Sequence, residues 1–160
     1  IFLLLLHCCI LHYFSYTTHN VMPIPKLGNV AFKVKRSGAG LGLFAGEDVK
    51  RGTWIIEYMG RILRGKEVNS IENKYLFETS DVRMIDGSAR SNTARYINHS
   101  CKPNCEPEIF AGRVFIRAIK RIKAGEEFTY DYGEEYVNEY IKPYGCRCTP
   151  CINKKVEKKA

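Results

Sequence analysis

The sequence lacks the short motifs that mark several large enzyme classes. It contains no Gly-Lys-Ser or Gly-Lys-Thr sequence, which excludes a P-loop for nucleotide phosphates, and no Gly-x-Ser-x-Gly nucleophile elbow. The pair Gly40 and Gly42 lacks the third glycine of a dinucleotide-binding fingerprint, so a plain turn is the simpler interpretation of these residues. Internal repeats and low-complexity tracts are also missing, which leaves one compact globular domain as the working assumption.

Residues 1–21 contain no charged side chain, whereas the sequence after Met22 is a normal globular mixture. The apolar run from Ile1 to Leu11 is shorter than the roughly 20 residues of a membrane helix, and it lacks the basic start and cleavage site of a signal peptide. We expect this apolar leader to be dispensable, for example as translated sequence upstream of a start at Met22. A membrane or export segment and a packed part of the domain are the alternatives.

The formal net charge of +8 lies wholly within residues 22–160, for which we expect no membrane association. Such a balance suits contact with nucleic acid or with an acidic surface such as chromatin. Acidic residues nevertheless gather between Ala124 and Ile141, where six of them occur without a single Lys or Arg. This segment either attracts a basic peptide to a site or forms a merely solvated acidic surface.

Cysteines are concentrated near the end of the chain. Cys146, Cys148 and Cys151 form the sequence CRCTPC, in which they are too close together to pair easily with one another. This spacing favours a metal site over a disulfide framework and therefore indicates a reducing compartment inside the cell.

Short β-rich runs separated by turn residues dominate the sequence after Met22 and predict a mainly-β fold of small sheets. The segment ILRGKEVNSI at 62–71 predicts one short amphipathic helix, and SGAGLG at 37–42 predicts a glycine-rich turn. The expected strands are 30–35, 53–60, 74–80, 82–87 and 113–119.

Two tyrosines alternate with an acid in the motif YDYG. In a strand, Tyr130 and Tyr132 would point to the same face, where two phenols can line a narrow channel with apolar walls and polar tips. The alternative is that both side chains simply pack in the core.

Four motifs follow one another along the chain. They are GLGLFAGEDVKRGTWIIEYMG, ARYINHSCKPNC, GEEFTYDYG and the cysteine cluster just beyond. Together they resemble the SET-domain protein lysine methyltransferases over roughly Ala31 to Cys151. The resemblance implies a SET-domain fold of several small β-sheets with short helices and a C-terminal pseudoknot. It also divides the chain into a SET domain at 22–140 and a post-SET segment with a basic tail at 141–160.

The resemblance implies an enzyme that transfers a methyl group from S-adenosylmethionine to a lysine side chain. Tyr132 corresponds to the family's catalytic tyrosine and Tyr58 to a second phenol beside the lysine channel. Tyr130 occupies a position where the family carries Phe or Tyr, and its phenol implies a bias toward monomethylation. The implied cofactor-binding residues are Gly40, Leu41, Gly42, Tyr75, Asn98, His99 and Tyr132.

The family's post-SET segment binds a structural zinc ion through one cysteine of the NHSC motif and three later cysteines. Here the later set reads C-x-C-x2-C, which is two residues shorter than the usual C-x-C-x4-C. We expect Cys101, Cys146, Cys148 and Cys151 to be the zinc ligands. Cys105 is either a substitute ligand or a buried apolar cysteine.

Histone tails are the natural substrate to expect, since they are basic and rich in lysine, and the implied location is then chromatin in the nucleus. Nucleosome or nucleic-acid contact through a basic surface would fit the net charge. Alternatives are a methyltransferase of a non-histone protein, and a catalytically silent SET module that binds chromatin or a protein partner. A small nucleic-acid-binding domain is a third, for which the sequence offers no recognisable motif.

Overall fold

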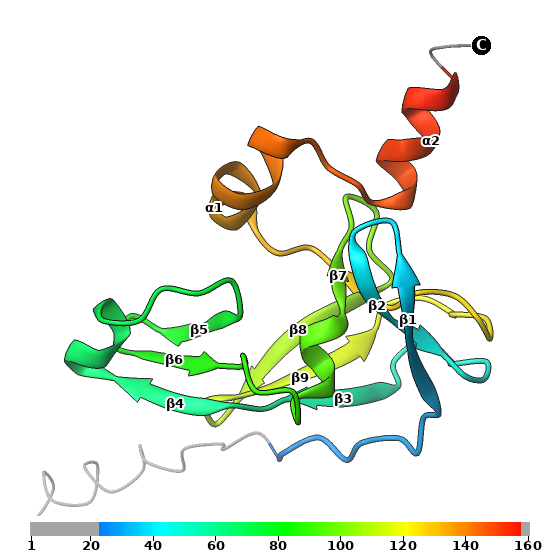
Figure 1. The fold of residues 1–160 in the computed structure, drawn as a ribbon. Helices are drawn as coiled ribbons and strands as arrows, with labels where there is room; N and C mark the ends of the chain where they lie inside the picture. Colours follow the sequence, from blue (N-terminus) through cyan, green and yellow to red (C-terminus); the bar gives the residue numbers. More distant parts are fainter. Residues whose placement is uncertain (1–22, 158–160) are drawn as a thin grey trace, which may run out of the picture.

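The computed structural model describes residues 23–157 (Figure 1). The apolar leader and the last three residues of the basic tail lie outside the described residues. Within the described range, none of the helices combines the length and the apolar character needed to span a bilayer.

Short strands make up most of the regular structure, which confirms the mainly-β class. The strands are β1 (Phe32–Ser37), β2 (Gly40–Ala45), β3 (Trp54–Tyr58), β4 (Arg61–Arg64), β5 (Leu76–Ser80), β6 (Arg83–Asp86), β7 (Asn98–His99), β8 (Cys105–Phe110), β9 (Arg113–Ala118) and β10 (Thr129–Tyr130). The helical segments are η1 (Gly65–Asn69), η2 (Thr93–Tyr96), α1 (Glu134–Tyr136), η3 (Val137–Ile141), η4 (Lys142–Tyr144) and α2 (Thr149–Glu157).

The strands form four small sheets (Figure 1). The hairpin β1–β2 lies at one side of the molecule, the sheet β3–β9–β8 in the middle, and the sheet β4–β6–β5 at the opposite side. All pairs in these three sheets are antiparallel, whereas β10 pairs with β7 in parallel. The expected strand pair at 74–80 and 82–87 is confirmed as β5 and β6.

The predicted helix at 62–71 is wrong. Its first part is strand β4, in which Leu63 is fully buried and pairs with Met84 of β6. Gly65 then takes a positive φ of 53° and begins only a short 3₁₀ turn. Sheet hydrogen bonds and burial therefore override the helical pattern of these residues.

The predicted glycine-rich turn at 37–42 is shorter than expected. Only Gly38 and Ala39 form the turn, and Gly40 already begins β2, where it pairs with Ser37. Gly40 has a φ of +124°, a conformation that side chains with a Cβ rarely adopt. The remaining glycine of the pair, Gly42, is thus a strand residue.

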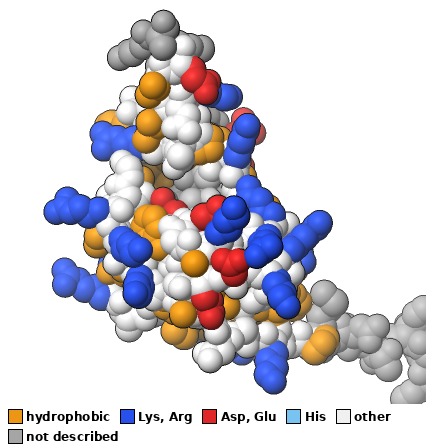
Figure 2. Space-filling view, turned by 90° about the vertical axis from the view of Figure 1, so that its right-hand side faces the viewer, with side chains coloured by type: hydrophobic (Ala, Val, Ile, Leu, Met, Phe, Trp, Pro, Cys, Tyr) orange, Lys and Arg blue, Asp and Glu red, His pale blue; other side chains and the backbone are white. Residues whose placement is uncertain are grey.

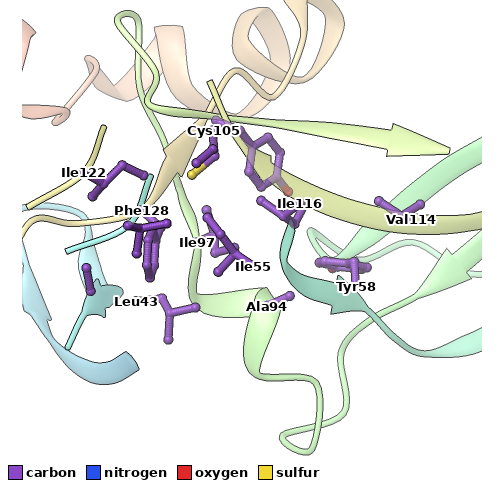
Figure 3. Packing of buried hydrophobic residues seen from close by; sticks show 14 of the residues in the cluster. Leu43, Ile55, Tyr58, Ala94, Ile97, Cys105, Val114, Ile116, Ile122 and Phe128 are labelled. Carbon is purple, nitrogen blue, oxygen red and sulfur yellow. The ribbon is translucent and has the colours of Figure 1, made fainter. Parts of the chain in front are cut away.

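The hydrophobic core lies between the hairpin and the central sheet. Figure 3 shows side chains from β2, β3, β9 and the segment before β10 meeting in one cluster. Three consecutive residues of the central strand β9 are all buried, because Val114 and Ile116 belong to this cluster whereas Phe115 packs against the rings of Trp54 and Phe110. Leu43 of β2 and Phe128 pack in the same cluster, and the Phe128 N–H donates to the Leu43 carbonyl at 2.8 Å.

The parallel pair β7–β10 is only two residues long, with Asn98 opposite Thr129 and His99 opposite Tyr130. The Ser100 N–H donates to the Tyr130 carbonyl at 3.0 Å and extends the pairing. This arrangement places the segment that leads to the C-terminus against the NHSC motif, as the expected pseudoknot requires.

Replacing Leu43 by Ala should lower the free energy of unfolding by about 2–5 kcal/mol, because the truncation of a fully buried leucine leaves a cavity in the core. Val82, which is 65% exposed, offers a matched control, and Val82→Ala should change stability by less than about 0.5 kcal/mol. Urea denaturation, followed by fluorescence, measures the free energy of unfolding of both variants. Equal effects of the two substitutions would contradict this core.

Candidate functional site

One large cavity, of about 1400 Å³, collects residues that are far apart in the sequence. It is lined by the start of β2, by β5, by the segment from η2 to β7, by β10 and by the chain that follows it. All the predicted catalytic and cofactor-binding residues except Gly42 line it. They are Gly40, Leu41, Tyr58, Tyr75, Asn98, His99, Tyr130 and Tyr132.

A continuous row of aromatic side chains forms one wall of the cavity. Ring centroids of successive members lie 4.8–6.4 Å apart, within the range of favourable aromatic interactions. The sequence predicted the channel phenols but missed the members that continue the row. In order along the wall, the row comprises Tyr58, Phe77, Tyr130, Tyr132, Tyr136 and Tyr140.

Two phenols of this row are held by backbone carbonyls. The Tyr58 hydroxyl donates to the Tyr75 carbonyl at 2.8 Å, and the Tyr132 hydroxyl donates to the Ile97 carbonyl at 2.7 Å. Burial raises the pKa of Tyr58, Tyr130 and Tyr132 above the ordinary value of 10, because the phenolate would be poorly solvated. All three are therefore neutral hydrogen-bonding groups across the physiological pH range.

His99 lies between the cavity and the cysteine cluster. Its Nδ1 accepts a hydrogen bond from the Tyr132 N–H at 3.3 Å, and its Nε2 lies 3.4 Å from the Cys101 Sγ. Because Nδ1 accepts, the proton of the neutral ring resides on Nε2 and points toward Cys101. Burial lowers the pKa of His99, and the nearby Asp131 only partly opposes that effect, so this neutral form dominates at pH 7.

Four cysteines converge at the edge of the cavity. The Sγ atoms of Cys101, Cys146, Cys148 and Cys151 all lie within 4.8 Å of one another. A tetrahedral Zn²⁺ with Zn–S distances of about 2.3 Å needs sulfur atoms about 3.8 Å apart. The Sγ atom of Cys101 lies 3.8 Å from the Sγ atom of Cys146 and 3.6 Å from that of Cys151. These four sulfur atoms therefore fit a tetrahedral zinc ion. The shortened C-x-C-x2-C spacing is accommodated because Cys151 lies in the first turn of α2.

The environment of Cys148 favours a thiolate. Burial alone would raise the pKa of this thiol, but hydrogen bonds from the backbone of Cys101 and Cys151 and from neighbouring thiols outweigh it and lower the pKa to about 7. Cys105 differs, because it is 1% exposed within the hydrophobic core, and burial raises its pKa to about 12. Cys105 is thus a buried apolar cysteine and not a member of the cluster.

Gly42 does not line the cavity. The space that its Cβ would occupy is taken by the carboxylate of Glu127, which would overlap such an atom. The absence of a side chain at this position therefore has a local packing cause, whereas Gly40 and Leu41 reach the cavity themselves.

Arg95 lines the cavity and was missed in the sequence, although it belongs to the motif ARYINHSC. Its guanidinium lies 4.0 Å from the centre of the Tyr75 ring, a cation–π interaction, and its buried Nε has no hydrogen-bond partner in the described part of the chain. A cation held in this way can attract an anionic group of a ligand.

Gly87 has a packing role beside Tyr58, the first member of the aromatic row. Gly87 leaves room for the Tyr58 ring, which a Cβ at this position would overlap. No motif marks Gly87, so only the folded chain reveals that it positions a channel phenol.

Acidic side chains surround part of the cavity. Asp131, Glu134 and Glu135 line it, and all three belong to the acidic segment between 124 and 141. The acidic segment therefore reaches the cavity and is not a solvated surface remote from any site, although Lys74, Arg90, Arg95 and Arg147 line other parts of the same cavity.

Comparison with known protein families identifies the architecture. A model of the SET domain matches residues 40–133, more than half of the chain. The chain belongs to the SET-domain family. The matched range contains Tyr130, Tyr132, the NHSC motif and Gly40 of β2, which meet at the cavity.

The relatives of this SET domain are much longer proteins. This chain is 39% identical over 126 residues to histone-lysine N-methyltransferase trr of Drosophila melanogaster. It is 36% identical over 121 residues to histone-lysine N-methyltransferase 2D of Homo sapiens. It is 35% identical over 124 residues to histone-lysine N-methyltransferase set1 of Dictyostelium discoideum. These matches cover 70%, 68% and 69% of this chain but only 5%, 2% and 8% of the respective relatives.

Proposed function

We propose that this SET domain is a protein-lysine N-methyltransferase that transfers a methyl group from S-adenosylmethionine to a lysine of a histone. The observation that carries the proposal is the single cavity in which the NHSC residues Asn98 and His99 meet the phenols of Tyr58 and Tyr132. The similarity to proteins whose names specify histone-lysine methylation supports the choice of substrate.

The cavity has room for both reactants. Its volume of about 1400 Å³ exceeds the roughly 300–1,000 Å³ of a pocket for one drug-sized ligand. Gly40, Leu41, Tyr75, Asn98 and His99 would hold S-adenosylmethionine, which supplies an electrophilic methyl group on a sulfonium when bound. The aromatic row would hold the aliphatic part of the lysine side chain.

The aromatic row also favours the reactive form of the lysine. A free lysine has a pKa near 10.4, so nearly all of it is protonated at neutral pH and cannot act as a nucleophile. Packing against buried apolar rings disfavours the ammonium form and lowers that pKa. Neutral Tyr58 and Tyr132 then offer polar tips that orient the nitrogen without adding charge, and positioning is the main contribution of these residues.

The acidic residues at the cavity help to bring a basic peptide to it. Asp131, Glu134 and Glu135 carry the charge opposite to that of a histone tail and act at longer range than the channel residues. Methylation of a panel of histones and of cell extract with labelled cofactor distinguishes a histone from a non-histone substrate. Binding of S-adenosylmethionine without transfer to any substrate would instead favour a silent SET module.

Replacing Tyr132 by Phe should lower the rate of methyl transfer by about 100-fold or more, because the ring packing remains while the polar group at the reacting centre is removed. Tyr144→Phe is the control, since Tyr144 lies at the rim, is 81% exposed, and should leave the rate nearly unchanged. Transfer of labelled methyl groups to a histone measures both. Undiminished transfer by the Tyr132 variant would rule out this role.

We further propose a bias toward monomethylation. The Tyr130 side chain is 7% exposed and packs 4.9 Å from the Tyr132 ring, so its hydroxyl occupies space that additional methyl groups would need. Tyr130→Phe should shift the products toward dimethyl- and trimethyl-lysine, which mass spectrometry of a modified peptide resolves. An identical product distribution in the two proteins would contradict the assignment.

The four clustered cysteines are proposed to bind one structural zinc ion per chain. Cys146→Ser should lower the zinc content measured by mass spectrometry of the metal, whereas Cys105→Ser should retain it, because Cys105 lies outside the cluster. Cys146 and Cys148 line the cavity, so removal of zinc by a chelator should reduce methyl transfer as well as stability. Full activity of a metal-free sample would refute this coupling.

A basic face on the β1–β2 side of the molecule is proposed to bind nucleic acid. Figure 2 shows many Lys and Arg side chains and fewer acidic ones on the side that carries this hairpin. The pairing of Val49 with Ile122 brings two basic turns together beside it. The basic face consists of the exposed residues Lys33, Lys35, Arg36, Lys50, Arg51, Arg121 and Lys123. A nuclear location would fit such binding and the reduced state that the cysteine cluster requires.

The triple variant Lys33→Gln, Lys35→Gln and Arg36→Gln should weaken binding to a DNA duplex, because fewer phosphates are then neutralised by the protein. The slope of log affinity against log salt concentration should fall by about 0.9 for each phosphate that the variant no longer neutralises. The control replaces Arg64, Lys66 and Lys142, which are exposed outside the basic face, with Gln. Fluorescence anisotropy measures both, and equal weakening would show that only net charge matters.

A further inference from the structure

Glu127 connects the hairpin β1–β2 to the NHSC motif. One carboxylate oxygen accepts a hydrogen bond from the Ser37 hydroxyl at 2.9 Å, and the other accepts from the Asn98 amide at 2.7 Å. The same Asn98 nitrogen donates to the Leu41 carbonyl at 3.0 Å. One partly buried carboxylate thus joins Ser37 of the hairpin to Asn98, and Asn98 in turn bonds Leu41, which borders the cavity as Asn98 does.

The backbone of Glu127 is itself held in place. It bridges Phe44 of β2, and its carbonyl accepts a hydrogen bond from the Asn104 side chain at 2.7 Å. Gly42 completes the arrangement, because any side chain at that position would collide with the Glu127 carboxylate. The bridged backbone and the hydrogen bonds from Ser37 and Asn98 therefore hold the carboxylate beside Asn98, in the space that Gly42 leaves open.

These hydrogen bonds fix the orientation of the Asn98 amide. Glu127 and the Leu41 carbonyl are both acceptors, so the NH₂ group of Asn98 must face them and its two hydrogens are used there. The Oδ1 atom is consequently the part of the amide left to interact with a ligand in the cavity, and it can only accept.

We propose that Glu127 is a positioning residue for the methyl donor, which it serves by orienting Asn98 so that Oδ1 accepts a hydrogen bond from the donor's α-ammonium group. The inference rests on the proposed function, since it assumes that the ligand is S-adenosylmethionine. The negative charge of Glu127 beside this position further favours a cationic group there. Gly42 contributes by admitting the carboxylate, without touching the ligand.

The test compares two ligands that differ in the amino-acid part. S-Adenosylhomocysteine carries the α-ammonium group, whereas 5′-methylthioadenosine lacks the amino-acid part. Glu127→Gln should weaken binding of the first by about tenfold, because it removes the negative charge beside the α-ammonium group and replaces one of the two acceptor oxygens that orient Asn98 by an NH₂ donor, and should leave the second within twofold. Isothermal titration calorimetry measures both affinities.

Glu126→Gln is the matched control, because Glu126 is the neighbouring residue, is exposed and accepts a hydrogen bond from the Lys123 N–H instead. It should change neither affinity. Equal binding of S-adenosylhomocysteine by wild type and Glu127→Gln, or equal weakening of both ligands, would overturn the inference. Failure of the wild type to bind either ligand would overturn the proposed function, and the inference with it.

A second pair of variants tests the role of Gly42 through folding alone. Gly42→Ala should lower the melting temperature, since the new Cβ meets Glu127. The same substitution should cause a smaller drop in a Glu127→Asp background, where the carboxylate is withdrawn by one methylene group. Additive decreases in the double variant would overturn the packing argument, whatever the binding data show.

Discussion

The two-residue parallel pairing of β7 with β10 is the interaction on which the rest of the site depends. It aligns Asn98 with Thr129 and His99 with Tyr130, and thereby joins a motif in the middle of the chain to the segment that leads to the C-terminus. Its few hydrogen bonds contribute little stability by themselves. The buried residues on either side, such as Ile97 and Phe128, hold it in register.

This pairing has consequences in both directions along the chain. Toward the C-terminus it directs Tyr132 and Tyr136 into the aromatic row and returns the last cysteines to Cys101. Toward the hairpin it places Asn98 beside Leu41. The β2 side of the cavity, the phenols and the cysteine cluster are therefore one structural unit, and His99 touches Tyr132 and Cys101 directly.

Features of the fold and of the site were predictable from the sequence where neighbouring residues determine them, and were missed where a contact with a distant residue determines them. The strands β5, β6 and β9 were predicted because alternation and flanking turn residues are local signals. The phenols of Tyr130 and Tyr132 were predicted because they belong to a specific motif. The helix predicted at 62–71 failed because the partner of Leu63 lies in β6, twenty-one residues away. Phe77 and Tyr136 join the aromatic row only through tertiary packing, and no local pattern marks them.

The charges around the cavity pose a problem that burial resolves. Under the proposed function, acidic residues such as Asp131 and Glu134 would attract a lysine in its charged form, yet that form cannot act as a nucleophile. The row of rings from Tyr132 to Tyr58 offers no charged partner and poor solvation, so an ammonium would be favoured beside the acidic residues and disfavoured against the rings. Under the proposed function, proton loss would therefore accompany the passage of the lysine to the rings, and the phenols would not supply a new charge there, because burial raises their own pKa and keeps them neutral.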